Sequence, residues 1–233
     1  MDSFTISQLN ALNLAFYRTT APYFNDTRQT AWVGWQRLLP YLEPPIHVLD
    51  VGCGNGRFGV FLANHFSSEI RYHGIDSDTT LLHYADENLR QLLPSYTLTE
   101  LDIIEKPFPS GKYNLVVAFG LLHHIPSRQN RLMFMQRLAE KVIEGGFLVF
   151  ACWRFMDVEN FRKRIVAWPE HLAREEGDYL LDWRHGQSAI RYCHYVDDTE
   201  HAALVQATGF TEVERYKADG RNNALNQYSI LRH

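Results

Sequence analysis

"VLDVGCGNGRFG", residues 48–59, is the stretch that decides the fold. An apolar run ends in Asp50, and glycines follow at 52, 54, 56 and 59. A strand, a glycine turn and a helix start place backbone N–H groups against a ligand at the carboxyl end of a sheet. Residues 54–59 also satisfy the G-x-G-x-x-G fingerprint of dinucleotide sites, whereas no Gly-Lys-Ser/Thr follows, which excludes a Walker-type phosphate loop.

Asp50 discriminates between the two ligands that remain possible, a nicotinamide dinucleotide and S-adenosylmethionine. Asp76 lies about twenty residues downstream, where both a nicotinamide site and an S-adenosylmethionine site place an acid on the ribose hydroxyls. A carboxylate at position 50 would repel a pyrophosphate but attract the sulfonium and ammonium groups of S-adenosylmethionine. The glycine spacing also lets the backbone approach this ligand without a Cβ clash. The turn therefore favours S-adenosylmethionine.

Strands and helices alternate along most of the chain. We expect two N-terminal helices, the first capped by Ser7 and the second running from about Arg28 to Tyr41. Strands are predicted at 46–52, 71–78, 96–102, within 112–125 and at 145–153, with helices at 57–66, 78–91 and about 127–142. After an inserted segment near 157–196, the order is helix (198–210), strand (211–216), loop and strand (227–233).

This order predicts an α/β fold with a Rossmann-like seven-stranded sheet. The sheet should be mostly parallel with its last strand antiparallel, because only that strand follows its neighbour without a helix, and helices should cover both faces. We expect one domain, 1–233. It would comprise a helical N-terminal cover (1–45), a cofactor-binding core (46–154), an acceptor-side insertion (155–196) and a C-terminal helix with a strand pair (197–233).

Composition limits the function classes. The formal charge is −4 and the pI near 6.2, so a nucleic-acid partner would need a local basic patch. The three cysteines are far apart, which is typical of a reducing compartment and argues against a disulfide framework or a zinc site, so we expect no metal. With no apolar run long enough to cross a bilayer and a polar N-terminus, we expect a cytoplasmic protein without a membrane partner.

Three signatures in order make residues 46–154 resemble the class I S-adenosylmethionine-dependent methyltransferases. They are "VLDVGCGNG", "GIDSD" and "ELDI". The resemblance implies that Asp76 binds the ribose hydroxyls, that Asp102 lies near the adenine amine and that Ile103 lies against the ring. "AFGLLHHI" would line the methionine and acceptor side, and Arg28 is a candidate for the methionine carboxylate. The cofactor-binding set so implied is Arg28, Asp50, Gly52, Cys53, Gly54, Asn55, Gly56, Asp76, Ser77, Asp102, Ile103, Phe119 and Gly120.

Peripheral stretches resemble a narrower family, the methyltransferases that esterify 5-carboxymethyluridine at the tRNA wobble position. They are "YFNDTRQTAWVGW" (23–35), "GDYLLDWR" (177–184) and "IRYCHY" (190–195). The chain departs from that family at Asp182, Cys193 and Glu144, where the family has Pro, Tyr and Pro. The resemblance implies a tRNA partner and a small activating subunit.

The acceptor decides the catalytic chemistry. A carboxylate is already ionised at pH 7 and needs no base, only cations and donors that align it, for which Arg191, Tyr192 and His194 are candidates. A phenol or amine would need a base, and of the adjacent His123 and His124 we assign the role to His124. The alternatives are a small-molecule O- or N-methyltransferase, a non-catalytic S-adenosylmethionine-binding activator subunit, and a nicotinamide-dependent oxidoreductase.

Overall fold

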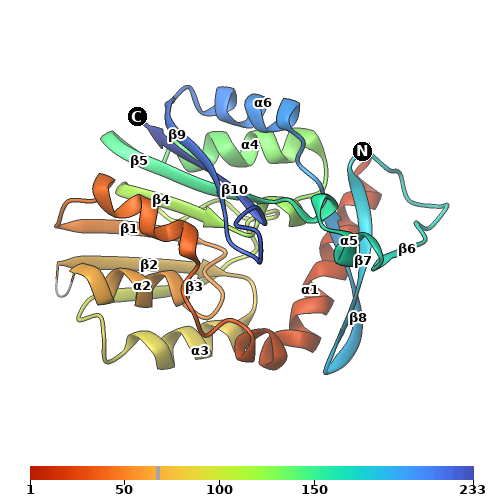
Figure 1. Ribbon diagram of the computed structural model, residues 1–233, viewed down its shortest axis with the longest axis horizontal. Coiled ribbons are helices and arrows are strands. Elements are labelled where there is room, and N and C mark those ends of the chain that lie inside the picture. Colours follow the sequence, from red (N-terminus) through yellow and green to blue (C-terminus); the bar gives the residue numbers. More distant parts are fainter. Residues whose placement is uncertain (67–68) are drawn as a thin grey trace.

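The computed structural model describes residues 1–66 and 69–233. Its main element is a seven-stranded sheet in the order β3-β2-β1-β4-β5-β10-β9 (Figure 1). The strands are β1 (Ile46–Val51), β2 (Ile70–Asp76), β3 (Tyr96–Glu100), β4 (Tyr113–Phe119), β5 (Val142–Trp153), β9 (Thr211–Ala218) and β10 (Asn226–Arg232). Neighbouring strands from β3 to β5 pair in parallel, and β10 is antiparallel to both β5 and β9. The predicted seven-stranded sheet with a reversed last strand is confirmed.

Helices cover both faces of this sheet. Figure 1 shows α2 (Arg57–Phe66) and α3 (Thr79–Leu89) on one side, and α4 (Arg128–Ala139) and α6 (Asp198–Thr208) on the other. Two apolar clusters fill the layers, one containing Trp35, Phe58 and Phe61 and the other containing Phe134, Met135 and Phe150. Strand β1 is buried along nearly its whole length because it lies between these two layers.

The N-terminal segment differs from its prediction at both helices. Helix α1 (Ser3–Asp26) starts five residues earlier than expected, because Asp2 and not Ser7 caps it by accepting from the Thr5 backbone N–H at 2.8 Å. The second element, η1, is a 3-10 helix over Val33–Tyr41, and not a helix from Arg28. Residues 27–32 instead form an irregular link that passes beside the glycine turn.

The inserted segment forms its own small sheet. Strands β6 (Ile165–Val166), β7 (Asp178–His185) and β8 (Gln187–His194) are antiparallel in the order β6-β7-β8. The segment begins with a short 3-10 turn, η3 (Phe155–Asp157), followed by the single turn α5 (Glu159–Arg162). Helix α1 packs against β8, and both lie beside the carboxyl ends of the parallel strands (right in Figure 1). Within the described ranges, no helix is both long and apolar enough to span a membrane.

Candidate active site

A cavity of about 510 Å³ opens at the carboxyl ends of the parallel strands. Its floor is formed by the turns after β1, β2, β3 and β4, and its walls by α1, the link 27–32, β8 and the β9–β10 loop. Parallel sheets expose a crevice at this edge because the connections leave it on opposite sides of the sheet. The cavity is therefore where the fold itself places a ligand.

The glycine turn after β1 has two different roles. Gly52 and Gly54 line the cavity with φ of +76° and +54°, and a Cβ on Gly54 would meet only Phe24, at 3.9 Å. Gly56 does not line the cavity. A Cβ there would lie 3.1 Å from Ala85 and Leu89, so this glycine permits α2 and α3 to pack closely. A Cβ on Gly52 would lie 3.1 Å from Leu121, so of these three glycines only Gly54 has open space on its Cβ side.

Asp50 is the next-to-last residue of β1; it lines the cavity and is almost fully buried. Tyr72 donates its hydroxyl to Asp50 Oδ2 at 2.6 Å across the β1–β2 pair. Burial raises the pKa of Asp50 to about 7, the Tyr72 hydrogen bond opposes that rise, and the nearby Asp76 adds to it. A cation bound here would relieve the cost of ionising this carboxyl.

The acids after β2 and β3 are fixed by backbone donors. Asp76 accepts from the N–H groups of Gly54 at 2.8 Å and Asp78 at 3.0 Å, and burial raises its pKa to about 6. Asp102 accepts from Ile104 N–H at 2.9 Å and from the Asn10 amide of α1 at 2.8 Å. Because a carboxylate has about four acceptor sites, each acid retains capacity for a ligand hydroxyl or amine.

Cations line the opposite wall. The Arg28 guanidinium lies over Phe24 at 4.5 Å and donates to Thr27, while burial lowers its pKa. Arg57 lies over Trp32 and donates to the Thr30 carbonyl at 2.9 Å, and burial lowers its pKa to about 10. Neither arginine pairs with a carboxylate of the described residues, so both remain available to an anion.

Arg191 on β8 is the most unusual of these cations. It is nearly buried, and its guanidinium lies 5.1 Å from the Phe16 ring centroid, 4.8 Å from that of Trp153 and 5.8 Å from that of Trp183. Among residues 1–66 and 69–233 it has neither a carboxylate partner nor a hydrogen-bond acceptor. A cation held among aromatic rings beside a cavity, with its donors free, is suited to bind an anion.

The double histidine after β4 lies at the same wall. His124 Nδ1 faces the Tyr192 carbonyl at 3.0 Å and must donate to it, so Nε2 accepts from the Tyr17 hydroxyl at 2.8 Å. Burial lowers the pKa of His124 to about 3 and that of His123 well below its ordinary value. Both rings line the cavity, and both are neutral at pH 7.

Tyr192 and His194 point away from the cavity. Tyr192 donates to Asp178 at 2.7 Å, and the His194 ring bridges Asp178 at 2.8 Å and Glu200 at 2.6 Å. Arg131 joins the same buried cluster through Glu200 at 2.7 Å. These two side chains support β8 from behind, and their position gives them no contact with an acceptor.

Of the residues expected at the site, the structure brings fourteen to the cavity wall and leaves Gly56, Tyr192 and His194 outside it. The sequence missed several others because their partners are distant in the chain. Asn10, Tyr17, Arg57, Trp153 and Asp219 all line the cavity, and of these only Arg57 lies beside a motif that signals it.

The comparisons with known proteins agree with this geometry. Residues 48–146 match the family model of the methyltransferase domain. The structure of an S-adenosylmethionine-dependent methyltransferase from Clostridium acetobutylicum superposes with a TM-score of 0.67 over 93% of this chain and 98% of that one, at 12% identity. Residues 48–146 therefore match a methyltransferase domain, and the chain has the fold of S-adenosylmethionine-dependent methyltransferases.

Two curated relatives carry more specific names. "Probable tRNA methyltransferase 9B" of Bos taurus is 25% identical over 163 residues, which are 68% of this chain and 33% of that protein. The "tRNA (carboxymethyluridine(34)-5-O)-methyltransferase" of Saccharomyces cerevisiae is 28% identical over 138 residues, 59% of this chain and 46% of the relative. This chain thus spans a third to a half of the length of these relatives.

Proposed function

We propose that the protein transfers the methyl group of S-adenosylmethionine to a carboxylate held by Arg191. The observation that carries this proposal is the buried, unpaired guanidinium of Arg191, surrounded by aromatic rings at the cavity wall. Burying an uncompensated cation costs stability, so a protein that retains one gains something from the anion that completes it. The His124 ring beside it is a weak base, because burial lowers its pKa to about 3, and this favours a carboxylate over a phenol or amine.

The cofactor supplies an electrophilic methyl group on a sulfonium. Asp50 faces the cationic end of this molecule, Asp76 accepts from its ribose hydroxyls, and Ile103 and Leu81 provide an apolar wall for the adenine. Arg28 lines the same cavity and would bind the methionine carboxylate. The remaining acceptor capacity of Asp76 and Asp102 and the open space beside Gly54 fit this ligand, whereas Asp50 would repel a pyrophosphate.

Arg191 has three tasks in this reaction. It replaces the water that an acceptor carboxylate loses on entering the cavity, aligns one oxygen with the methyl–sulfur bond, and leaves that oxygen unprotonated. An acceptor with a pKa near 4 is ionised at neutral pH, so no side chain has to remove a proton. His124 then orients Tyr17 and the wall, and it acts as a base only for a protonated acceptor.

We further propose that the acceptor is the 5-carboxymethyl group of a tRNA wobble uridine and that the chain works as a single domain in the cytoplasm. The names of the relatives support this choice, as do the Thr-Arg and Arg-Tyr-x-His stretches. Aromatic rings of Trp153 and Trp183 beside Arg191 are suited to contact a base. A small activating subunit that adds positive charge would explain how a protein with a net charge of −4 binds RNA.

A small carboxylic acid is the second candidate, because the cavity is enclosed by α1 and rich in aromatic residues. Labelled methyl donor should be incubated with total tRNA and, separately, with a pool of small metabolites. Methyl ester of carboxymethyluridine in digested tRNA supports the first acceptor, and label confined to the metabolite pool supports the second. Label on an amine or phenol, with both carboxylate classes unlabelled, would contradict the proposal.

A further inference from the structure

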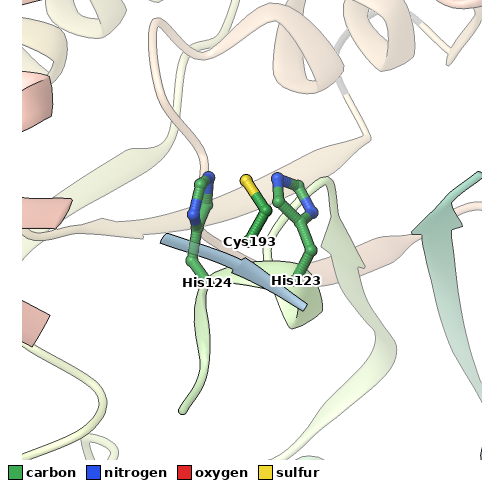
Figure 2. Close-up of side chains that lie close together, drawn as sticks. All are labelled: His123, His124 and Cys193. Atoms are coloured by element: carbon green, nitrogen blue, oxygen red, sulfur yellow. The ribbon is translucent and has the colours of Figure 1, made fainter. Parts of the chain in front are cut away.

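Three side chains that offer metal-ligand atoms converge behind the cavity wall. His123 and His124 come from η2 (Leu122–His124), and Cys193 comes from β8, about seventy residues later in the chain. One ligand atom from each lies within 4.8 Å of the other two, and all three residues are buried. In Figure 2 the Cys193 sulfur lies between the two imidazole rings, with a nitrogen of each ring beside it.

Of the three proposed ligand atoms, His124 Nε2 accepts a hydrogen bond from the Tyr17 hydroxyl, and the other two have no partner among the described residues. His123 Nδ1 is buried and has no hydrogen-bond partner, which is costly unless something else binds it. His124 donates its Nδ1 proton to a backbone carbonyl, the arrangement that directs Nε2 toward a metal in known sites. Cys193 Sγ has no partner among the described residues.

We propose that His123, His124 and Cys193 form a binding site for a zinc ion, with the fourth position open toward the cavity. Two imidazoles and a thiolate are a ligand set that Zn²⁺ accepts, and hard cations such as Mg²⁺ do not. In a tetrahedral zinc site with bonds of about 2.0–2.3 Å, the ligand atoms lie about 3.5 Å apart. The three ligand atoms here lie within 4.8 Å of one another, so side-chain movements of about 1 Å would bring them to that spacing. This inference rests on the cluster alone and does not depend on the identity of the methyl acceptor.

The electrostatics of the cluster are compatible with a metal. Burial lowers the pKa of both histidines, so each is neutral and ready to ligate at pH 7. Burial raises the pKa of the Cys193 thiol to about 12 and Arg191 opposes this, so binding must release the thiol proton to solvent. Tyr17, whose hydroxyl now donates to His124 Nε2, has to move aside or take the open position.

The test uses the full chain after chelation and dialysis, titrated with Co²⁺ as a spectroscopic substitute and with Zn²⁺ in competition. The expected result is one equivalent of cobalt with a thiolate-to-metal charge-transfer band, displaced by zinc and accompanied by proton release. Cys193→Ser and His123→Gln should each abolish the band. The matched controls are Cys152→Ser, another buried thiol, and His201→Gln, whose Nδ1 is equally buried and unpartnered; both should retain it.

S-adenosylhomocysteine binding verifies that each variant is folded, and two independent ligand variants keep the test valid if one fails to fold. Absence of stoichiometric uptake by the wild type, or a band that persists in the folded Cys193→Ser variant, overturns the proposal.

Discussion

Replacing Arg191 by methionine separates the anion-binding role of this residue from a structural one. The methionine side chain keeps an unbranched apolar stem against Phe16 and Trp153 and removes only the charge and the donors. If the guanidinium binds the acceptor carboxylate, the variant loses charged hydrogen bonds worth about 3 kcal/mol. That loss corresponds to about a hundredfold in kcat/KM.

The stability of the Arg191→Met variant, unlike its activity, should not fall. Arg191 is almost buried without an anionic partner, so replacing it by an apolar residue removes an uncompensated charge. The expected Tm of Arg191→Met is therefore equal to or above that of the wild type, and S-adenosylhomocysteine binding is retained. An ordinary packing residue would show loss of stability together with loss of activity.

The assay follows methyl transfer to a carboxylate acceptor, with thermal unfolding and calorimetric S-adenosylhomocysteine titration on the same samples. Arg137→Met is the matched control, because Arg137 also lies over a ring, that of Phe108 at 4.5 Å, but outside the cavity. An Arg191→Met enzyme within about threefold of the wild type, or one that is inactive only because it unfolds, would refute the reasoning.

Three other predictions follow from the cavity and its supports. S-adenosylhomocysteine affinity should rise with pH up to about 7, where Asp50 ionises. Asp50→Asn should remove this part of the dependence in calorimetric titrations at pH 6 and 8 and leave the smaller part due to Asp76, whose pKa is about 6. His194 bridges two acids that raise its pKa, so its contribution to stability is complete below its unfolded pKa and is lost as pH rises through the folded value. His194→Gln should therefore cost about 3 kcal/mol in chemical denaturation at pH 6 and less at pH 9, and an equal cost at both would contradict the pairing. Gly54→Ala should lower cofactor affinity more than it lowers the free energy of unfolding, and Gly56→Ala should lower the free energy of unfolding more than cofactor affinity. If both variants lost the same property, the separate roles of the two glycines would be refuted.

Local pattern predicted most of the fold because each element carries its own signal. The apolar run ending at Asp50, the glycine turn and the alternation of strands and helices each depend on residues close in the chain. The N-terminal segment was harder, since Ser7 and Asp2 are both residue types that cap helices, and the structure uses Asp2 where we expected Ser7. The Tyr72 hydroxyl on Asp50 depends on the register of β1 against β2, which no short window contains.

The stretch Arg191 to His194 shows how a motif misleads when it is taken as a unit. Successive residues of a strand point to opposite faces, so Arg191 and Cys193 face the cavity wall while Tyr192 and His194 face the ion cluster behind it. Recognising 187–194 as a strand would have divided the four residues correctly. It would also have placed Cys193 on the side of the strand that faces His123 and His124. The separation of about seventy residues along the chain gives no sign of this proximity.

The N-terminal segment decides which acceptors can reach Arg191. Hydrogen bonds connect it to the turns of the sheet, among them three side-chain pairs at 2.8 Å: Asn10 to Asp102, Tyr17 to His124, and Asn25 to Asn55. A bond of this kind contributes about 1 kcal/mol net, so releasing these three bonds costs a few kcal/mol, apart from the apolar packing of α1 on β8. We expect a small acid to enter the cavity with α1 in place, and an anticodon nucleotide to require α1 to move. Lowering the cost of this movement, as in Asn10→Ala, should therefore raise the rate of methyl transfer to tRNA relative to the rate with a small acceptor, measured on the same enzyme sample; an unchanged ratio of the two rates would contradict this role of α1.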